Sequence, residues 1–251
     1  MNKNKIESLA DNVINPITGE LFSIPSLDMG GYADLRFILR EGGSMGDLYS
    51  RTDLRRDANG AIYMDESNNV YTQKIDNPDS YIKLGSVLPK GNLAWRNNFM
   101  WKNFHVGFMI SARLGGVVFS RTQAVLDKFG VSEASANARD NGFVLINGND
   151  RINPENWYTT VGSTAVPQYY TYSATNVRLQ EASIGYTIPR KWLANICDIK
   201  VSLIGRNLWM IYNKAPFDPE AVASTDNFYQ GIDNFMMPSL RNVGFSLNFK
   251  F

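Results

Sequence analysis

The last ten residues of the chain, NVGFSLNFKF (242–251), alternate strictly between polar and apolar residues and end on an aromatic ring. A period of two is typical of a β-strand with one apolar and one polar face. The end of a soluble domain is usually polar and poorly held at the surface. The pattern therefore predicts a strand that either packs on the core of a soluble sandwich or turns its apolar face to lipid.

Residues 93–114 predict a β-hairpin, because two alternating runs flank the pair Lys102-Asn103. A two-residue turn places Trp101 and Phe104 directly opposite each other on one face. Both strands then carry their apolar residues on that face, whereas polar residues such as Arg96 occupy the other. The two patterns agree, which favours the hairpin.

Further strands are predicted at 33–41, 46–56, 177–189 and 199–211, which brings the total to about seven. The pattern of the 46–56 segment alternates poorly. In 177–189 the alternation changes phase near Gln180 and Glu181, which indicates a β-bulge. Two short helices are expected inside the long insertion 115–176: one over 118–129, stopped by Gly130, and one from Asn153 to Gly162.

The connections between these strands alternate between short and long, with long ones at 57–92, 115–176 and 212–238. In an up-and-down meander every long loop then lies at one end and every short turn at the other. Outer-membrane barrels sort their loops in this way, whereas a Greek-key sandwich has no reason to do so. No run of 18 apolar residues occurs, so no transmembrane helix is predicted.

Composition and motifs give little support for an enzyme or a nucleic-acid-binding protein. Lys plus Arg number 25 against 24 Asp plus Glu, so no basic surface for nucleic acid is expected. His105 is the only histidine, and no nucleophile, phosphate-loop or zinc motif accompanies it. The carboxylates of one long loop could hold calcium, but their spacing matches no known loop pattern. We therefore predict no catalytic residue, no cofactor and no metal; the four loop carboxylates are Asp218, Glu220, Asp226 and Asp233.

Three segments near the C-terminus resemble a known family. They are NVRLQEASIGYTIPRKWL (176–193), IKVSLIGRNLWMIYNKAPFDPEA (199–221) and GIDNFMMPSLRNVGFSLNFKF (231–251). Together they resemble the C-terminal end of the SusC/RagA family of TonB-dependent outer-membrane transporters. The likeness is clear over 170–251 and looser over 32–64 and 83–120. It rests on several motifs in the expected order, which makes it specific.

The resemblance implies an all-β fold: about seven antiparallel, up-and-down strands of a larger, 22-stranded transmembrane barrel, with the short helices in a long extracellular loop. Residues 1–31 would be an extracellular loop or irregular segment, and 32–251 the C-terminal part of the barrel. A plug, a TonB box and a signal peptide are not recognised in these residues. The chain is then expected to be the last quarter of a transporter, unable to transport alone.

The same resemblance implies the location and the partners. The protein would lie in the bacterial outer membrane as a multi-pass barrel in contact with outer-membrane lipid, and import oligosaccharides or peptides, with glycans favoured. A SusD-like surface lipoprotein would cover it, and the TonB complex would power it. The barrel-assembly machinery would recognise the aromatic C-terminus, here Phe245, Phe249 and Phe251. The alternative is a soluble β-rich carbohydrate-binding module.

Two sets of side chains are candidates for function. Aromatic rings beside amides suit sugar rings or peptide backbones, although packing of the loop against its neighbours or against the lipoprotein is the favoured explanation. The substrate-binding candidates are Trp157, Tyr158, Tyr169, Tyr170 and Tyr172, with Arg178 and Arg206 on polar strand faces. Aromatics beside turns suit a membrane interface. The aromatic girdle is predicted at Trp101, Phe104 and Trp192 near the short turns, with Trp209 and Tyr212 toward the other end.

Overall fold

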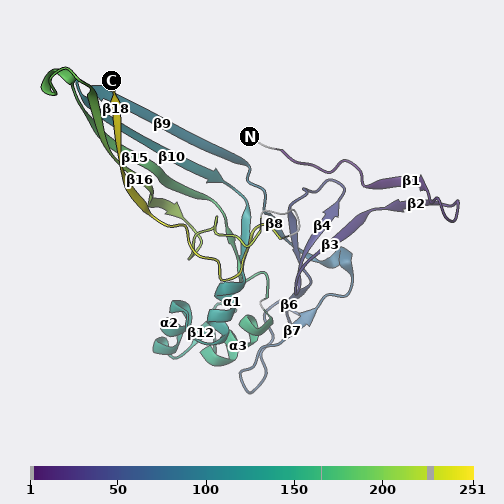
Figure 1. The fold of residues 1–251 in the computed structure, drawn as a ribbon. Helices are drawn as coiled ribbons and strands as arrows, with labels where there is room; N and C mark the ends of the chain where they lie inside the picture. The colour runs from purple at the N-terminus through teal and green to yellow at the C-terminus, as the bar shows by residue number, and fades with distance from the viewer. Residues whose placement is uncertain (1–2, 165, 225–228) are drawn as a thin grey trace.

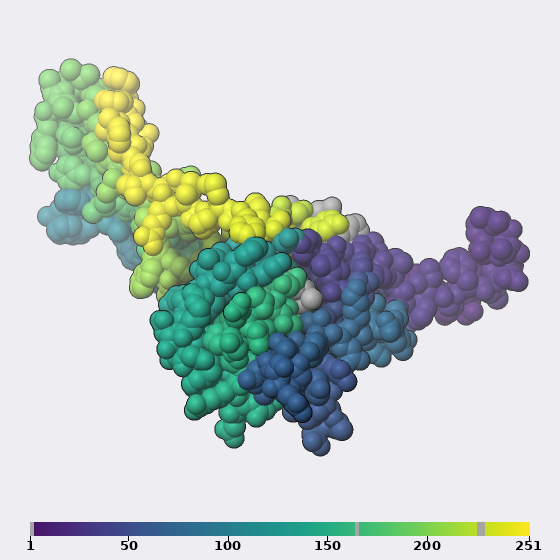
Figure 2. All heavy atoms as spheres, turned by 90° about the horizontal axis from the view of Figure 1, so that it is seen from below, coloured from purple at the N-terminus to yellow at the C-terminus, as the bar shows by residue number. Residues whose placement is uncertain are grey.

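The protein divides into a sheet of long strands and a lobe of short strands and helices, as seen in a computed structural model that describes residues 3–164, 166–224 and 229–251. In Figure 1 the long strands run together toward the end that carries the C-terminus, and the helices gather at the opposite end. Figure 2 shows that the sheet and the N-terminal hairpin project from opposite sides of the lobe.

The sheet contains five antiparallel strands in the order β18 (Asn242–Lys250), β16 (Asp198–Asn213), β15 (Asn176–Ile188), β10 (Phe104–Leu114) and β9 (Gly91–Trp101). The predicted hairpin is confirmed, with Trp101 opposite Phe104 across a turn in which Lys102 has a φ of 53°. The predicted bulge is confirmed as well: Met109 pairs with Glu181 and Ile110 with Leu179, which leaves Gln180 as the extra residue.

The lobe is assembled from the N-terminal strands and the long connections. A four-stranded sheet joins β3 (Ser26–Tyr32), β4 (Leu35–Arg40), β5 (Asp47–Ser50) and β8 (Ile82–Ser86). A second sheet has β11 (Val117–Ser120) between β14 (Thr171–Ser173) and the parallel β17 (Ile232–Asp233). Three pairs complete the strands: β1 (Ala10–Ile14) with β2 (Leu21–Ile24), β6 (Thr52–Leu54) with β7 (Thr72–Lys74), and β12 (Val144–Ile146) with β13 (Asp150–Ile152). Short 3₁₀ turns occur at Pro78–Ser80 and Arg190–Trp192.

The strands predicted at 33–41 and 46–56 exist, but they are β4, β5 and β6 of the lobe and not part of the five-stranded sheet. All four residues of β5 are buried, so this strand has no wet face to produce a polar alternation. The main sheet therefore contains five of the seven strands that we expected.

Three helices lie in the 115–176 insertion: α1 (Arg121–Lys128), α2 (Glu133–Asn141) and α3 (Pro154–Thr164). The α1 helix begins later than predicted because Ser120 is its N-cap, and the preceding residues pair as β11. Gly162 does not end α3. A Cβ at this position would lie 2.6 Å from the Ala124 carbonyl oxygen, so the glycine allows α1 and α3 to pack closely. None of the helices in the described ranges has the length and apolar content needed to cross a bilayer.

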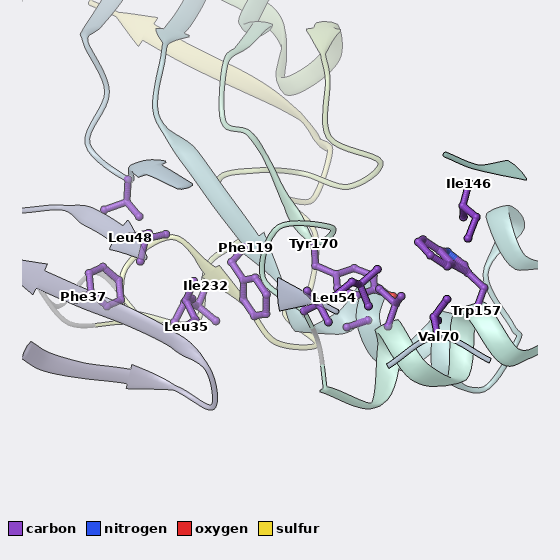
Figure 3. Packing of buried hydrophobic residues seen from close by; sticks show 14 of the residues in the cluster. Leu35, Phe37, Leu48, Leu54, Val70, Phe119, Ile146, Trp157, Tyr170 and Ile232 are labelled. Atoms are coloured by element: carbon purple, nitrogen blue, oxygen red, sulfur yellow. The ribbon is translucent and has the colours of Figure 1, made fainter. Parts of the chain in front are cut away.

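A single hydrophobic cluster forms the core of the lobe (Figure 3). It joins the N-terminal strands to the helices, from Phe37 and Leu48 through Phe119 to Trp157. Among the described residues, none of the buried members of this cluster comes from the five-stranded sheet. The long strands therefore place their apolar side chains elsewhere.

Candidate functional site

The five-stranded sheet presents one continuous apolar face. Strand register aligns one apolar residue from every strand in a single row: Phe99, Val106, Ile184, Leu203 and Phe245. These side chains are between 42% and 78% exposed. Monomeric soluble proteins rarely expose apolar patches of more than a few hundred Å². The face is thus an interaction surface.

Aromatic side chains lie near both ends of this face. At the short-turn end Trp101 stacks on Phe104 with ring centroids 6.5 Å apart, and Phe104 meets Tyr186 edge-on at 4.8 Å. Trp192 is exposed in the nearby turn between β15 and β16. Toward the lobe, β16 carries the exposed Trp209 and Tyr212. The arrangement is that expected of the predicted girdle, whose role in a membrane stays a prediction.

The residues predicted to form the C-terminal assembly signal are also exposed. Phe245 and Phe249 lie on the apolar face, opposite Leu203 and Ile199 of β16. Phe251 follows the end of β18 and is 85% exposed. The rings are therefore available to another protein, and their recognition by assembly machinery remains a proposal.

The opposite face of the sheet is polar and carries paired charges. One row crosses all five strands at Arg96, Met109, Glu181, Arg206 and Asn242. Glu181 lies 3.5 Å from the Arg96 guanidinium and 3.6 Å from that of Arg206, so two cations share one carboxylate. Exposed pairs of this kind add little stability. These ion pairs show that the polar face is suited to water and charge, whereas the apolar face of the same sheet is suited to neither.

Arg178 anchors the long 214–241 segment to the sheet. Its guanidinium lies 2.9 Å from an Asp218 oxygen and 3.1 Å from Glu220, and it donates to Asn176 and to Asn207. The Arg178 side chain is only 3% exposed. Arg178 was predicted to bind substrate, but the structure surrounds its guanidinium with partners from the protein itself. Asp218 and Glu220 lie about 40 residues further along the chain, so no local sequence pattern predicts that they pair with Arg178. The only signal in the sequence is that these residues belong to the family motif.

Asp218 is the most constrained carboxylate of this network. Burial alone would raise the pKa of its side chain, but hydrogen bonds from Ser239 and Arg178 outweigh burial and lower that pKa below its usual value. Asp218 therefore stays ionised and keeps the segment attached to Arg178.

The predicted aromatic candidates divide by burial. Trp157 is 9% and Tyr170 2% exposed, and both belong to the core of the lobe. Tyr158 and Tyr169 are partly buried and pack against that core. The rings of Tyr169 and Trp157 meet edge-on with their centroids 5.4 Å apart. Tyr172 is half-buried; burial, with the charge of Asp127 nearby, raises its pKa to about 12. Trp157 and Tyr170 therefore pack in the core, which is the alternative to substrate binding that the sequence left open.

Three of the four acidic residues considered for calcium already have partners. Asp218 and Glu220 pair with Arg178, and Asp233 accepts a 2.6 Å hydrogen bond from Ser120. Asp226 lies outside the described residues. Within the described ranges, no group of three or more candidate side chains could hold a metal ion.

Comparison with known proteins agrees with the predicted resemblance. The TonB-dependent receptor P3 of Formosa agariphila is 27% identical to the chain in an alignment that covers 78% of the chain and 19% of the receptor. The RagAB peptide importer in its closed-closed state matches 92% of the chain at 17% identity with a TM-score of 0.61. Its open-open state matches 96% at 12% identity with a TM-score of 0.57.

The chain is thus similar in sequence to a TonB-dependent receptor and in fold to RagAB, which confirms the predicted resemblance to SusC/RagA-type proteins. No family model matches the chain. The chain spans about a fifth of the curated receptor and between 25% and 31% of the RagAB chains.

Proposed function

We propose that these residues form the C-terminal part of an outer-membrane, TonB-dependent importer of oligosaccharides or peptides. The observation that carries the proposal is the row from Phe99 to Phe245, which turns an apolar side chain from each of five strands outward. Transmembrane barrel strands need about 9–11 residues to cross a bilayer, and β9 and β10 have 11 each. The row then faces lipid.

The orientation follows from the loops. In outer-membrane barrels short turns face the periplasm and long loops face outside. The Lys102-Asn103 turn would then be periplasmic, and the lobe would lie on the outer surface, under the proposed SusD-like lipoprotein. The polar face with Arg96 and Arg206 would line the wet interior. The other strands, the plug and the contact with TonB would belong to protein outside these residues. This division treats 32–251 as the barrel portion, with its lobe, and 1–31 as part of the outer surface.

The structure disfavours a soluble carbohydrate-binding module. Such a module would have to cover the apolar face, yet Phe99 and Phe245 are 59% and 78% exposed, and the ring contact of Phe99 is with Phe108 on the same face of the neighbouring strand. Leaving this face in water would promote association. A soluble module also offers no reason for loops to be sorted by length at the two ends of the sheet.

The proposal can be tested with one pair of cysteines on β9. Cys197, the only native cysteine, is first replaced by serine in the complete open reading frame. Asn98→Cys, on the polar face, should react with a water-soluble maleimide in isolated outer membranes about tenfold faster than Phe99→Cys, on the apolar face. After denaturation the labelling rates of the two variants should be equal, because positions 98 and 99 are then equally exposed to water. Equal rates in the membrane would contradict the proposal.

A further inference from the structure

A polar cleft of about 490 Å³ opens where β15 and β16 meet the 214–241 segment. Strand residues on its walls come from the polar face, which we assign to the barrel interior. The residues that matter for its chemistry are Gln180, Arg206, Asn207 and Asn242 from the strands and Glu220 and Met237 from the segment. The cleft lies near the lobe end of β15, which in the proposed orientation is the outer end, where a substrate would enter.

Two adjacent irregularities shape the cleft. The β15–β16 register passes from Leu179–Trp209 to Glu181–Arg206 and so leaves Gln180 on β15, and Asn207 and Leu208 on β16, outside regular pairing. Asn207 has a φ of 52°, a conformation that costs free energy for a residue with a side chain. Bulges re-aim side chains and are frequent beside functional sites. Here they bring two amide side chains to one hollow.

Hydrogen-bonding capacity in the cleft is incompletely used. The Gln180 carbonyl accepts from Ser111 at 3.3 Å, but its amide nitrogen has no partner among the described residues. Arg206 is 68% exposed, and its one described ion pair is the 3.6 Å contact with Glu181, which Arg96 shares. Glu220 remains 42% exposed beside Arg178. The cleft therefore offers free donors and both signs of charge.

This chemistry favours a peptide over a sugar. Side-chain amides match the N–H and C=O groups of an extended backbone, and a guanidinium matches a carboxylate. The exposed Met237 and Leu240 supply apolar contact for peptide side chains. Among the described residues no aromatic ring lines the cleft, whereas an exposed ring would be expected of a sugar platform.

We propose that this cleft is a peptide-binding subsite, in which Arg206 holds a carboxylate of the peptide while Gln180 and Asn242 bind its main chain. The inference rests on the proposed function and narrows its substrate class. Trp157 and Tyr170, which the sequence predicted as substrate-binding residues, are buried, whereas a ligand in the cleft can contact the residues named here.

The test compares two charge reversals on the same face of the full-length receptor. The purified receptor is incubated with a tryptic digest of casein, and retained peptides are quantified by mass spectrometry. Arg206→Glu should lower retention about tenfold, as loss of a charge-assisted hydrogen bond does. Arg96→Glu is the matched control, because Arg96 pairs with the same Glu181 but does not line the cleft. Its effect should stay below about twofold.

A second variant keeps the test decisive if Arg206→Glu fails to assemble. Gln180→Ala removes the free amide without changing charge and should lower retention about threefold. Equal retention of the casein peptides by the wild type and both cleft variants would overturn the inference. The sugar maltoheptaose is tested as a second probe. A wild-type receptor that retains maltoheptaose, or that retains neither the peptides nor the sugar, would also overturn it. The cysteine pair on β9 is measured on the same preparations. Normal labelling with failed peptide binding overturns only the cleft, whereas abnormal labelling overturns the proposed function.

Discussion

The sheet and the lobe use large apolar side chains in opposite ways. In the lobe Phe37 and Phe119 are 1% exposed and lie in one cluster, whereas Phe99 and Phe245 of the sheet are 59% and 78% exposed. Both regions are built from β-strands of the same chain. The difference teaches that apolar content does not by itself mark a core: the period of the pattern and the strand register decide where the side chains go.

Strand length separates the two regions as clearly as burial does. The strands of the sheet run from 9 residues in β18 to 16 in β16, while lobe strands such as β5 and β6 have 4 and 3 residues. A long strand with one wet face needs strict alternation. A short strand buried on both faces can be apolar throughout. The lobe strands therefore suit a protein interior, whereas the sheet suits one wet face and one apolar environment, which we propose is lipid.

The largest effect is expected from a cavity in the lobe. Phe119→Ala removes a fully buried ring, and substitutions of this kind cost about 3–5 kcal/mol. Urea unfolding of the protein in detergent, followed by the fluorescence of Trp157 in the lobe, measures the loss. The matched Phe245→Ala on the sheet leaves no cavity and should cost clearly less. Equal losses at the two positions would break the comparison.

A charge on the apolar face should come next. Leu203→Arg places a cation where we assign lipid, which costs about 2–4 kcal/mol near the bilayer midplane. Ile204→Arg, the next residue on the polar face, is the control and should cost less than about 1 kcal/mol. Urea midpoints of the protein folded into lipid vesicles give both values. Similar midpoints for the two variants would show that the faces are not in different solvents.

The anchor between the two regions should have an intermediate effect. Asp218→Asn keeps the shape but removes the charge that faces the buried Arg178, at a cost of about 1.5–3 kcal/mol. Hydrogen exchange should speed up over 214–224 and not in β9 or β10. Unchanged exchange would mean that Asp218 does not hold the segment.

The same anchor predicts a pH dependence. The pKa of Asp218 is lower in the folded protein than its ordinary value of 3.8, so its contribution is complete above that pH and is lost as the pH falls through the folded pKa. The stability difference between wild type and Asp218→Asn should therefore shrink below about pH 3.8. A difference that instead shrank toward neutral pH would contradict this sign.

The smallest of these effects is expected at the contact between α1 and α3. Gly162→Ala would place a methyl group 2.6 Å from the Ala124 carbonyl oxygen, and overpacking of this kind costs about 1–3 kcal/mol. Gly142→Ala at the end of α2 is a useful contrast, because its Cβ meets no atom within 4 Å, although its φ of 80° carries backbone strain. Thermal unfolding of the lobe compares the two. A fully neutral Gly162→Ala would show that the helices can separate.

Local patterns made the sheet predictable. The hairpin register at Trp101 and Phe104 and the bulge at Gln180 both follow from alternation within a few residues. The α2 helix was missed because EASANARDN has no apolar stripe beyond its alanines. The burial of Trp157 and Tyr170 depends on strands more than a hundred residues earlier, such as the one that contains Leu54. No local pattern reports such long-range packing.

Tryptophan quenching by brominated lipid tests the central claim most directly. Single-tryptophan forms of the protein, retaining either Trp95 on the apolar face or Trp157 in the lobe core, are placed in vesicles of brominated phospholipid. We expect strong quenching of Trp95, because its side chain lies against the acyl chains, and little quenching of Trp157. Quenching of Trp157 that equals or exceeds that of Trp95 would contradict the assignment of the sheet to lipid and the lobe to its own core.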